Sequence, residues 1–393
     1  MATKIAIRFA AIAALLLSAA ACKYPYEVVI PEADYPLVIE GDILLGATST
    51  FRFSHVLPMD SGPVVFSAWN SSGWIEGENG VRVEGWVSRS GDVLEFDTTA
   101  LPANQRYKLH LHSPEGRVIV SDWLDVCPAP TIDDLSYWKN GQYNELHIGL
   151  SMHCNGAHYF RWSYTEEWEY HSDILSPYEY DPDRYEEGVI ESPDGPKYYY
   201  CWDDQEASVI NIFSTENQIE DRFEELSFHR IPLTNLRLQS LYRMTLHLEA
   251  ISEEAYTYWR TVRQNSGEQG SLFAPTPSEV ASNLRCTSDP SFQVLGYVNA
   301  ANVATATMYY DNHVAGYYQP PVVNYLKRRQ QEIPVDLDSC LFAYKDGLLP
   351  FNPVYDMMGT DIVAYTWADR DCIDCRRLGG HKNKPADWPN DHK

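Results

Sequence analysis

Two cysteines, Cys372 and Cys375, lie close together near the end of this chain, and that spacing is compatible with three kinds of chemistry. A structural zinc site needs four ligands, but His381 and His392 are separated by more than the usual spacing of about three to five residues. A thioredoxin-like redox pair opens a helix, whereas a Gly-Gly dipeptide at 379–380 soon follows this pair. We therefore interpret the pair as part of a disulfide that fastens the C-terminal loop.

The beginning of the chain indicates which redox environment applies. Residues 1–21 contain two basic residues, an apolar run at 9–17 and then small residues, which is the pattern of an export signal. The apolar run is too short to span the roughly 30 Å of a bilayer core. Cys22 follows three alanines, as in a bacterial lipobox; the alternative is an ordinary cleaved signal. We expect lipidation of Cys22, a tether over 22–35 and a membrane anchor made of lipid alone.

Export makes disulfides the default state of the other cysteines. Seven remain after Cys22, and an odd number leaves at least one of them without a partner inside the chain. The seven candidates are Cys127, Cys154, Cys201, Cys286, Cys340, Cys372 and Cys375. The pairing that we predict is Cys127–Cys154, Cys201–Cys286, and Cys340 with either Cys372 or Cys375.

The charge balance excludes two classes of partner. The formal net charge is −25, with 55 acidic and 30 basic residues. Nucleic acids and anionic lipid surfaces both require a basic face, so we expect neither as a partner. A basic cluster in the C-terminal segment stands out against this background and is a candidate for a partner contact or for an internal acidic neighbour. Its members are Arg376, Arg377, Lys382 and Lys384.

The composition favours a mainly β protein. The chain holds 27 Tyr, 11 Trp and 24 Pro, and long helical patterns are scarce. Five to seven short strand signals within 36–127 predict an immunoglobulin-like β-sandwich. The proline-containing stretch 127–134 is interpreted as a linker, and 135–393 as a larger β-rich domain. One helix is predicted at 252–264, with Ser252 as its N-cap.

One strand carries aromatic residues along a single face. Alternation over 159–172 places Phe160, Trp162, Tyr164, Trp168 and Tyr170 on one side, with Glu166 interrupting the series. Such a face can serve as a stacking platform for sugar rings, in which case Trp162, Tyr164, Trp168 and Tyr170 would be the ligand platform. The alternative, which we favour, is that these rings form the inner face of a sandwich.

The remaining polar clusters do not indicate an enzyme. Motifs of zinc proteases, serine hydrolases and phosphate-binding loops are not found in the sequence. A pair of carboxylates such as glycosidases use stays open, because acidic residues are abundant. An acidic stretch lacks the EF-hand pattern and is interpreted as a solvated loop. Its acidic residues are Asp181, Asp183, Glu186, Glu187 and Asp194. We expect no metal, no cofactor and no enzymatic activity.

Several segments, taken in order, resemble one protein family. They are YPLVIEGDI (36–43 with its preceding Tyr35), YFRWSYTEEWEYHS (159–172), Cys201-Trp202, residues 252–284, VLGYV (294–298) and CIDCRRLGGHKNKPADW (372–388). Together they are similar to domain-of-unknown-function family 4249, which comprises outer-membrane lipoproteins of the Bacteroidota.

The resemblance implies a location and a role but no catalytic residues. It implies an outer-membrane lipoprotein whose partner is a TonB-dependent β-barrel receptor, and we favour the extracellular face over the periplasmic face. We expect a non-enzymatic accessory or ligand-binding subunit of an uptake complex. The alternatives are a stand-alone surface lipoprotein that binds glycans or peptides and, less favoured, an extracellular hydrolase.

Overall fold

The computed structural model describes residues 35–56, 67–192, 197–207, 209–217, 220–267, 282–320 and 329–389. The predicted signal peptide and nearly all of the tether, Cys22 and Asp194 lie outside these residues. The fold is mainly β with few helices, as the composition predicts. Within the described ranges, the helices are too short or too polar to cross a membrane.

The N-terminal unit is one curled sheet of nine strands in the order β18-β8-β7-β4-β5-β6-β3-β1-β19. Side chains alternate along its strands; in β7, for example, Tyr107, Leu109 and Leu111 are buried while the residues between them are partly exposed. This alternation gives the sheet an apolar inner face. Its strands are β1 (Leu37–Glu40), β3 (Thr48–His55), β4 (Ser72–Gly77), β5 (Arg82–Val87), β6 (Val93–Asp97), β7 (Tyr107–His112), β8 (Val118–Ser121), β18 (Leu284–Cys286) and β19 (Val294–Leu295).

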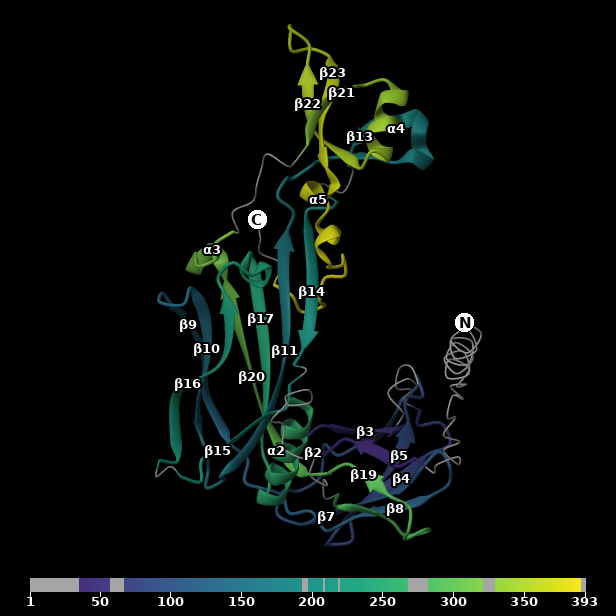
Figure 1. Ribbon diagram of the computed structural model, residues 1–393, viewed down its shortest axis with the longest axis vertical. Helices are drawn as coiled ribbons and strands as arrows, with labels where there is room; N and C mark the ends of the chain where they lie inside the picture. Colours follow the sequence, from purple (N-terminus) through teal and green to yellow (C-terminus); the bar gives the residue numbers. More distant parts are fainter. Residues whose placement is uncertain are drawn as a thin grey trace, which may run out of the picture.

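The second unit consists of two sheets packed face to face (Figure 1). A six-stranded sheet has the order β14-β11-β17-β20-β2, with β15 also paired to β11, and a three-stranded sheet has the order β16-β10-β9. Their apolar faces enclose a core that includes Phe160, Met244 and Leu246. The strands are β2 (Ile43–Leu45), β9 (Thr131–Asn140), β10 (Glu145–His153), β11 (Tyr159–His171), β14 (Tyr200–Glu206), β15 (Asn211–Ser214), β16 (Arg222–Pro232), β17 (Leu241–Ala250) and β20 (Ala300–Asp311).

Short helices complete this unit. The helix predicted at 252–264 is present as α2 (Glu253–Gly267), and the Ser252 hydroxyl accepts a hydrogen bond from Ala255 N at 3.1 Å. A side-chain acceptor at this position satisfies one of the amides that the first turn leaves unpaired. The 3-10 helix η2 (Leu236–Leu238) precedes β17, and α3 (Asn312–Ala315) follows β20.

The two units exchange strands, so the predicted division into 36–127 and 135–393 does not follow the sheets. β2 comes from the N-terminal segment but pairs in parallel with β20 of the second unit. In the other direction, β18 and β19 form the two ends of the N-terminal sheet. Strand signals in the sequence locate strands but not their partners, which explains the difference.

A third group of elements forms an arm beyond the ends of β11 and β14, at the top of Figure 1. Its core contains Tyr180, Cys340 and Trp367. Arg184 forms ion pairs with Glu179, Asp181 and Glu187, so the acidic stretch is partly neutralised within the chain. The elements are β12 (Tyr178–Tyr180), η1 (Pro182–Glu187), β13 (Val189–Glu191), β21 (Gln330–Pro334), α4 (Leu337–Lys345), β22 (Leu348–Tyr355), β23 (Ile362–Asp369), α5 (Arg370–Ile373) and η4 (Cys375–Leu378).

Candidate functional site

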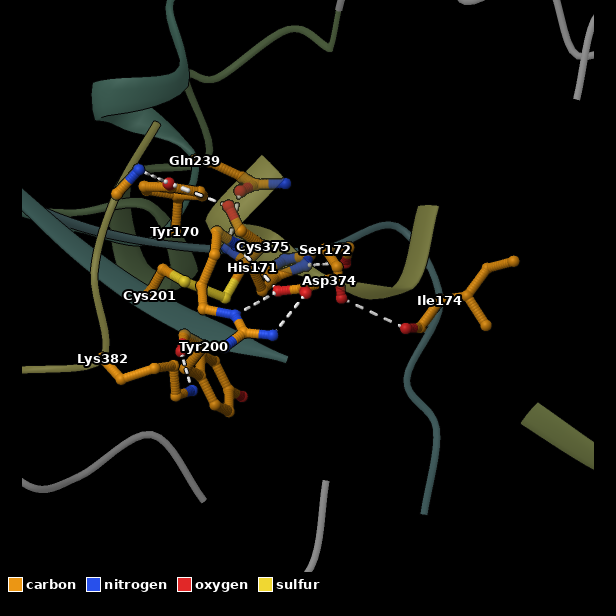
Figure 2. The surroundings of a disulfide bond; sticks show 12 residues. Tyr170, His171, Ser172, Ile174, Tyr200, Cys201, Gln239, Asp374, Cys375 and Lys382 are labelled. Atoms are coloured by element: carbon orange, nitrogen blue, oxygen red, sulfur yellow. Dashed lines mark hydrogen bonds and ion pairs between the residues drawn. A yellow bond between two sulfur atoms is a disulfide. The ribbon is translucent and has the colours of Figure 1, made fainter. Parts of the chain in front are cut away.

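The disulfide in the described structure joins Cys201 in β14 to Cys375 in η4 (Figure 2). The predicted pairing is therefore wrong for Cys201, whose partner is not Cys286, and for Cys375, which is not bonded to Cys340. Cys127 and Cys154 are likewise not joined to each other.

The fold explains these differences. Cys286 lies in β18, in the N-terminal sheet, and Cys340 is buried in the core of the arm. The C-terminal segment, by contrast, runs back alongside β14. The Cys-x-x-Cys spacing does not make a bond within the pair, because its second cysteine bonds to a strand 174 residues earlier.

The residues after the disulfide form a C-terminal clasp, which we define as 375–389. Tyr170 donates its hydroxyl proton to the Cys375 carbonyl at 3.0 Å and accepts a hydrogen bond from Gly380 N at 2.7 Å. The backbones of Trp202 and His381 exchange two hydrogen bonds, at 2.8 and 2.9 Å. The clasp thus adds a bridge to the outer edge of β14 and is held there by backbone and side-chain contacts.

Basic residues of the C-terminal segment have acidic or aromatic neighbours within the chain. Arg376 makes a bidentate ion pair with Asp374, at 2.8 and 2.7 Å, and Arg377 contacts Asp371 at 3.3 Å. Lys382 donates to the Tyr200 carbonyl (Figure 2) and lies 5.7 Å from the centre of the Trp202 ring. The internal-neighbour interpretation of the sequence accounts for these three side chains.

The aromatic face of β11 packs inside the protein and does not form an exposed platform. Tyr170 is 1% exposed and Trp168 is 7% exposed. Trp162 and Tyr164 are half-buried against the three-stranded sheet, where both rings contact Phe228. The alternation of β11 is as predicted, but its aromatic side faces β10 and β16, which cover it.

Glu166, which interrupts that face, is a buried carboxylate with a complete set of donors. Arg237 donates to both of its oxygens at 2.9 and 2.8 Å, Tyr242 donates at 2.8 Å, and His229 lies at 3.1 Å. Burial opposes ionisation of Glu166, but the hydrogen bond and charge of His229 and the charge of Arg237 outweigh it, and the pKa is lowered. The group is satisfied within the core, so we assign it a structural role.

The strongest candidate for a ligand site is a cleft where the N-terminal sheet meets the second unit. Two cavities open there, and Gly41, Asp42 and Arg161 line both of them. We call the pair the junction cleft. The aromatic chamber has a volume of about 570 Å³, and its side chains include Tyr258, Trp259, Val262 and Tyr297. The polar chamber has a volume of about 580 Å³, and its side chains include Thr50, Ser163, His247, Glu249 and Thr305.

Strand register places the polar side chains of the cleft. On β11 the odd-numbered positions face away from the aromatic core, and Arg161 and Ser163 are two of them. Arg161 is paired with Glu249 and Ser163 with His247 on the neighbouring β17. Thr305 on β20 is paired with His247. One face of the sheet therefore packs the core while the opposite face forms a wall of the cleft.

A buried ionic cluster lies between the chambers. Arg161 donates to Asp42 and, at 2.5 Å, to Glu249, and its guanidinium lies 4.9 Å from the centre of the Trp259 ring. Asp42 also accepts a hydrogen bond from Asn299 N at 2.8 Å. Two carboxylates therefore share one guanidinium.

The second carboxylate of this cluster is incompletely satisfied. Glu249 is 7% exposed, and its Oε2 has no hydrogen-bond partner in the part of the chain that the structure describes. Burial raises the pKa of Glu249; Arg161 opposes this shift, and Asp42 adds to it. A buried acceptor without a donor costs about 1–3 kcal/mol.

Two glycines allow the backbone to approach closely enough to form the cleft. A Cβ at Gly41 would lie 2.2 Å from the Thr50 carbonyl oxygen, and one at Gly296 would lie 2.1 Å from the Ile39 carbonyl oxygen. Both residues also have positive φ values, 149° and 124°, which side chains disfavour. Glycine is required at both positions.

Sequence reasoning missed the residues of the junction cleft. Asp42, Arg161, Glu249 and Trp259 are not among the predicted site residues, because they come from four distant segments. A partial signal existed in Arg161, a basic residue in the middle of an otherwise amphipathic strand.

Comparisons with known proteins identify a family. No protein with curated annotation matches the chain. Among solved structures, the chain is similar to a DUF4785 family protein from Legionella pneumophila, at 10% identity and a TM-score of 0.17. That match covers 53% of this chain and about half, 51%, of the other. The model of a domain of unknown function, DUF4249, matches residues 23–307. The chain therefore belongs to the DUF4249 family.

Proposed function

We propose that this chain is a non-enzymatic, lipid-anchored outer-membrane lipoprotein that binds a ligand for a TonB-dependent uptake complex. The observation that carries the proposal is the junction cleft. Its chambers fall within the range of roughly 300–1,000 Å³ that is usual for ligand sites, and it lies between two structural units, a frequent place for such sites. The lipobox-like sequence before Cys22 supports the anchor, and the family resemblance supports the uptake partner.

The arrangement of charges favours binding over acid–base catalysis. Both oxygens of Asp42 accept hydrogen bonds, one from Arg161 and one from Asn299 N. A general base needs an oxygen that reaches a substrate proton. An ionic cluster of this kind fixes the geometry of a site and orients a ligand.

A stand-alone lipoprotein that binds glycans or peptides is the second candidate function. It is favoured by the rings of the aromatic chamber, where Tyr258 lies 5.1 Å from both Trp259 and Tyr297, measured between ring centres. Grouped aromatic rings beside a charged pair suit a ligand with apolar faces and polar edges.

Affinity purification from the native membrane in mild detergent distinguishes the two functions. We expect a β-barrel receptor to co-purify with the wild-type chain and to be lost with Cys22→Ala, which removes the anchor. A ligand found by mass spectrometry without a barrel would support the stand-alone function. Trp259→Ala should abolish ligand recovery, whereas Tyr143→Ala, at a site 62% exposed and far from the cleft in sequence, should not. Recovery of neither ligand nor barrel would overturn the proposal.

A further inference from the structure

The walls of the polar chamber carry more acidic than basic groups. Asp42 and Glu249 line it, and Arg161 is the cation that both contact. His247 also lines the chamber, and burial lowers its pKa, which favours its neutral form. With both carboxylates ionised, the cluster has an excess negative charge that no side chain in the chamber wall neutralises.

Glu249 supplies the specific feature that a ligand can satisfy. It is more than nine-tenths buried, and Oε1 accepts from Arg161 while Oε2 is left without a donor. An N–H donor that carries positive charge forms a stronger hydrogen bond to a carboxylate than a neutral donor does. Burying such a donor also compensates the charge of the second carboxylate, which a neutral hydroxyl cannot do.

The adjoining chamber has a different character. Tyr258, Trp259 and Val262 present aromatic and aliphatic surface from α2, and Tyr297 adds a third ring. Because Gly41, Asp42 and Arg161 line both chambers, a ligand that enters the cleft meets apolar surface and the acidic cluster side by side.

We infer that the junction cleft binds a peptide that carries a basic side chain next to an aromatic or large aliphatic one. The ammonium or guanidinium group occupies the polar chamber and contacts Glu249, and the apolar side chain occupies the aromatic chamber against Trp259. A slender side chain reaches a carboxylate as deeply buried as Glu249 more readily than an amine attached directly to a sugar ring. This inference rests on the proposed function as a ligand-binding protein.

Calorimetric titration of the full mature chain in detergent tests the inference. The probes are the tetrapeptide acetyl-Ala-Lys-Phe-Ala-amide, the same peptide with norleucine in place of lysine, and the trimers of glucosamine and N-acetylglucosamine. We expect the lysine peptide to bind at least about tenfold more tightly than the norleucine peptide, a difference of about 1.4 kcal/mol. Because both peptides are tested on unmutated protein, this comparison does not depend on the folding of a variant.

Variants then locate the two contacts. Glu249→Gln should weaken the lysine peptide about tenfold and leave the norleucine peptide unchanged, whereas Trp259→Ala should weaken both. Tyr143→Ala is the matched control.

The results separate the inference from the proposed function. Equal affinities for the lysine and norleucine peptides, or binding of the glucosamine trimer in preference to the lysine peptide, would overturn the basic-peptide inference and leave a ligand-binding function standing. The same holds if no probe binds while native purification still recovers a ligand that Trp259→Ala abolishes. Failure of both experiments would overturn the proposed function as well.

Discussion

Trp388 donates its indole N–H to Glu169 Oε2 at 3.0 Å across 219 residues of sequence. The same carboxylate oxygen accepts from the indole of Trp202 at 3.1 Å, and the other accepts from Ser240 at 3.2 Å. Glu169 is 2% exposed, so these donors replace water around a buried carboxylate. The contact explains why an aromatic residue near the end of the clasp matters for the sheet.

Trp388→Phe should destabilise the protein by about 1.5–3 kcal/mol, the usual range for a hydrogen bond to a charged group. Phenylalanine preserves most of the apolar contact while removing the N–H. Urea unfolding followed by tryptophan fluorescence and circular dichroism measures the change. Trp69→Phe, at a site 56% exposed, is the control and should change stability by less than about 0.5 kcal/mol. Equal effects of the two substitutions would contradict the role assigned to the clasp.

The disulfide makes a second prediction about the clasp. Peptide mapping of the non-reduced protein should recover Cys201 cross-linked to Cys375, and denatured protein should expose Cys286 and Cys340 to alkylation. Cys201→Ser together with Cys375→Ser should lower stability by about 2–5 kcal/mol, because the cross-link restricts the unfolded chain. Recovery of a Cys201–Cys286 peptide would instead restore the pairing predicted from sequence.

The cluster at the junction cleft makes a third prediction. Arg161→Met leaves Asp42 and Glu249 without their counter-charge and should destabilise the protein by about 3 kcal/mol. Adding Glu249→Gln should recover part of this loss, because one of the two uncompensated carboxylates is removed. Arg285→Met, which removes an exposed ion pair with Asp122, is the control and should cost less than about 1 kcal/mol. Additive effects of Arg161→Met and Glu249→Gln would contradict the cluster.

The sequence predicts local features of this fold better than long-range pairings. The alternation of β11 and the helix after Ser252 follow from periodicity and capping, which act within a few residues. The partners of β2 and β18, and of Cys201, depend on contacts between segments more than 170 residues apart. No local pattern encodes such contacts, and the junction cleft, which combines Asp42, Arg161, Glu249 and Trp259, shares that property.

Glu166 gives a prediction about pH. Its pKa is lowered in the folded protein from the usual 4.5, so the folded state holds its proton less tightly than the unfolded state. Ionised Glu166 therefore stabilises the fold above pH 4.5, and this stabilisation is lost as the pH falls through the lower, folded-state pKa. Near pH 7, Glu166→Gln should cost about 2 kcal/mol through the weaker hydrogen bonds with Arg237 and Tyr242.

The difference in free energy of unfolding between wild type and Glu166→Gln, measured by urea unfolding from pH 7 to pH 3, isolates this group from the other carboxylates. It should be constant above about pH 5 and shrink steadily below pH 4.5. Glu84→Gln, at a side chain 66% exposed, is the matched control and should give a small difference throughout. A wild-type advantage that persists undiminished at pH 3 would mean that the stabilisation comes from the shape of the side chain rather than from the ionised carboxylate between Arg237, Tyr242 and His229.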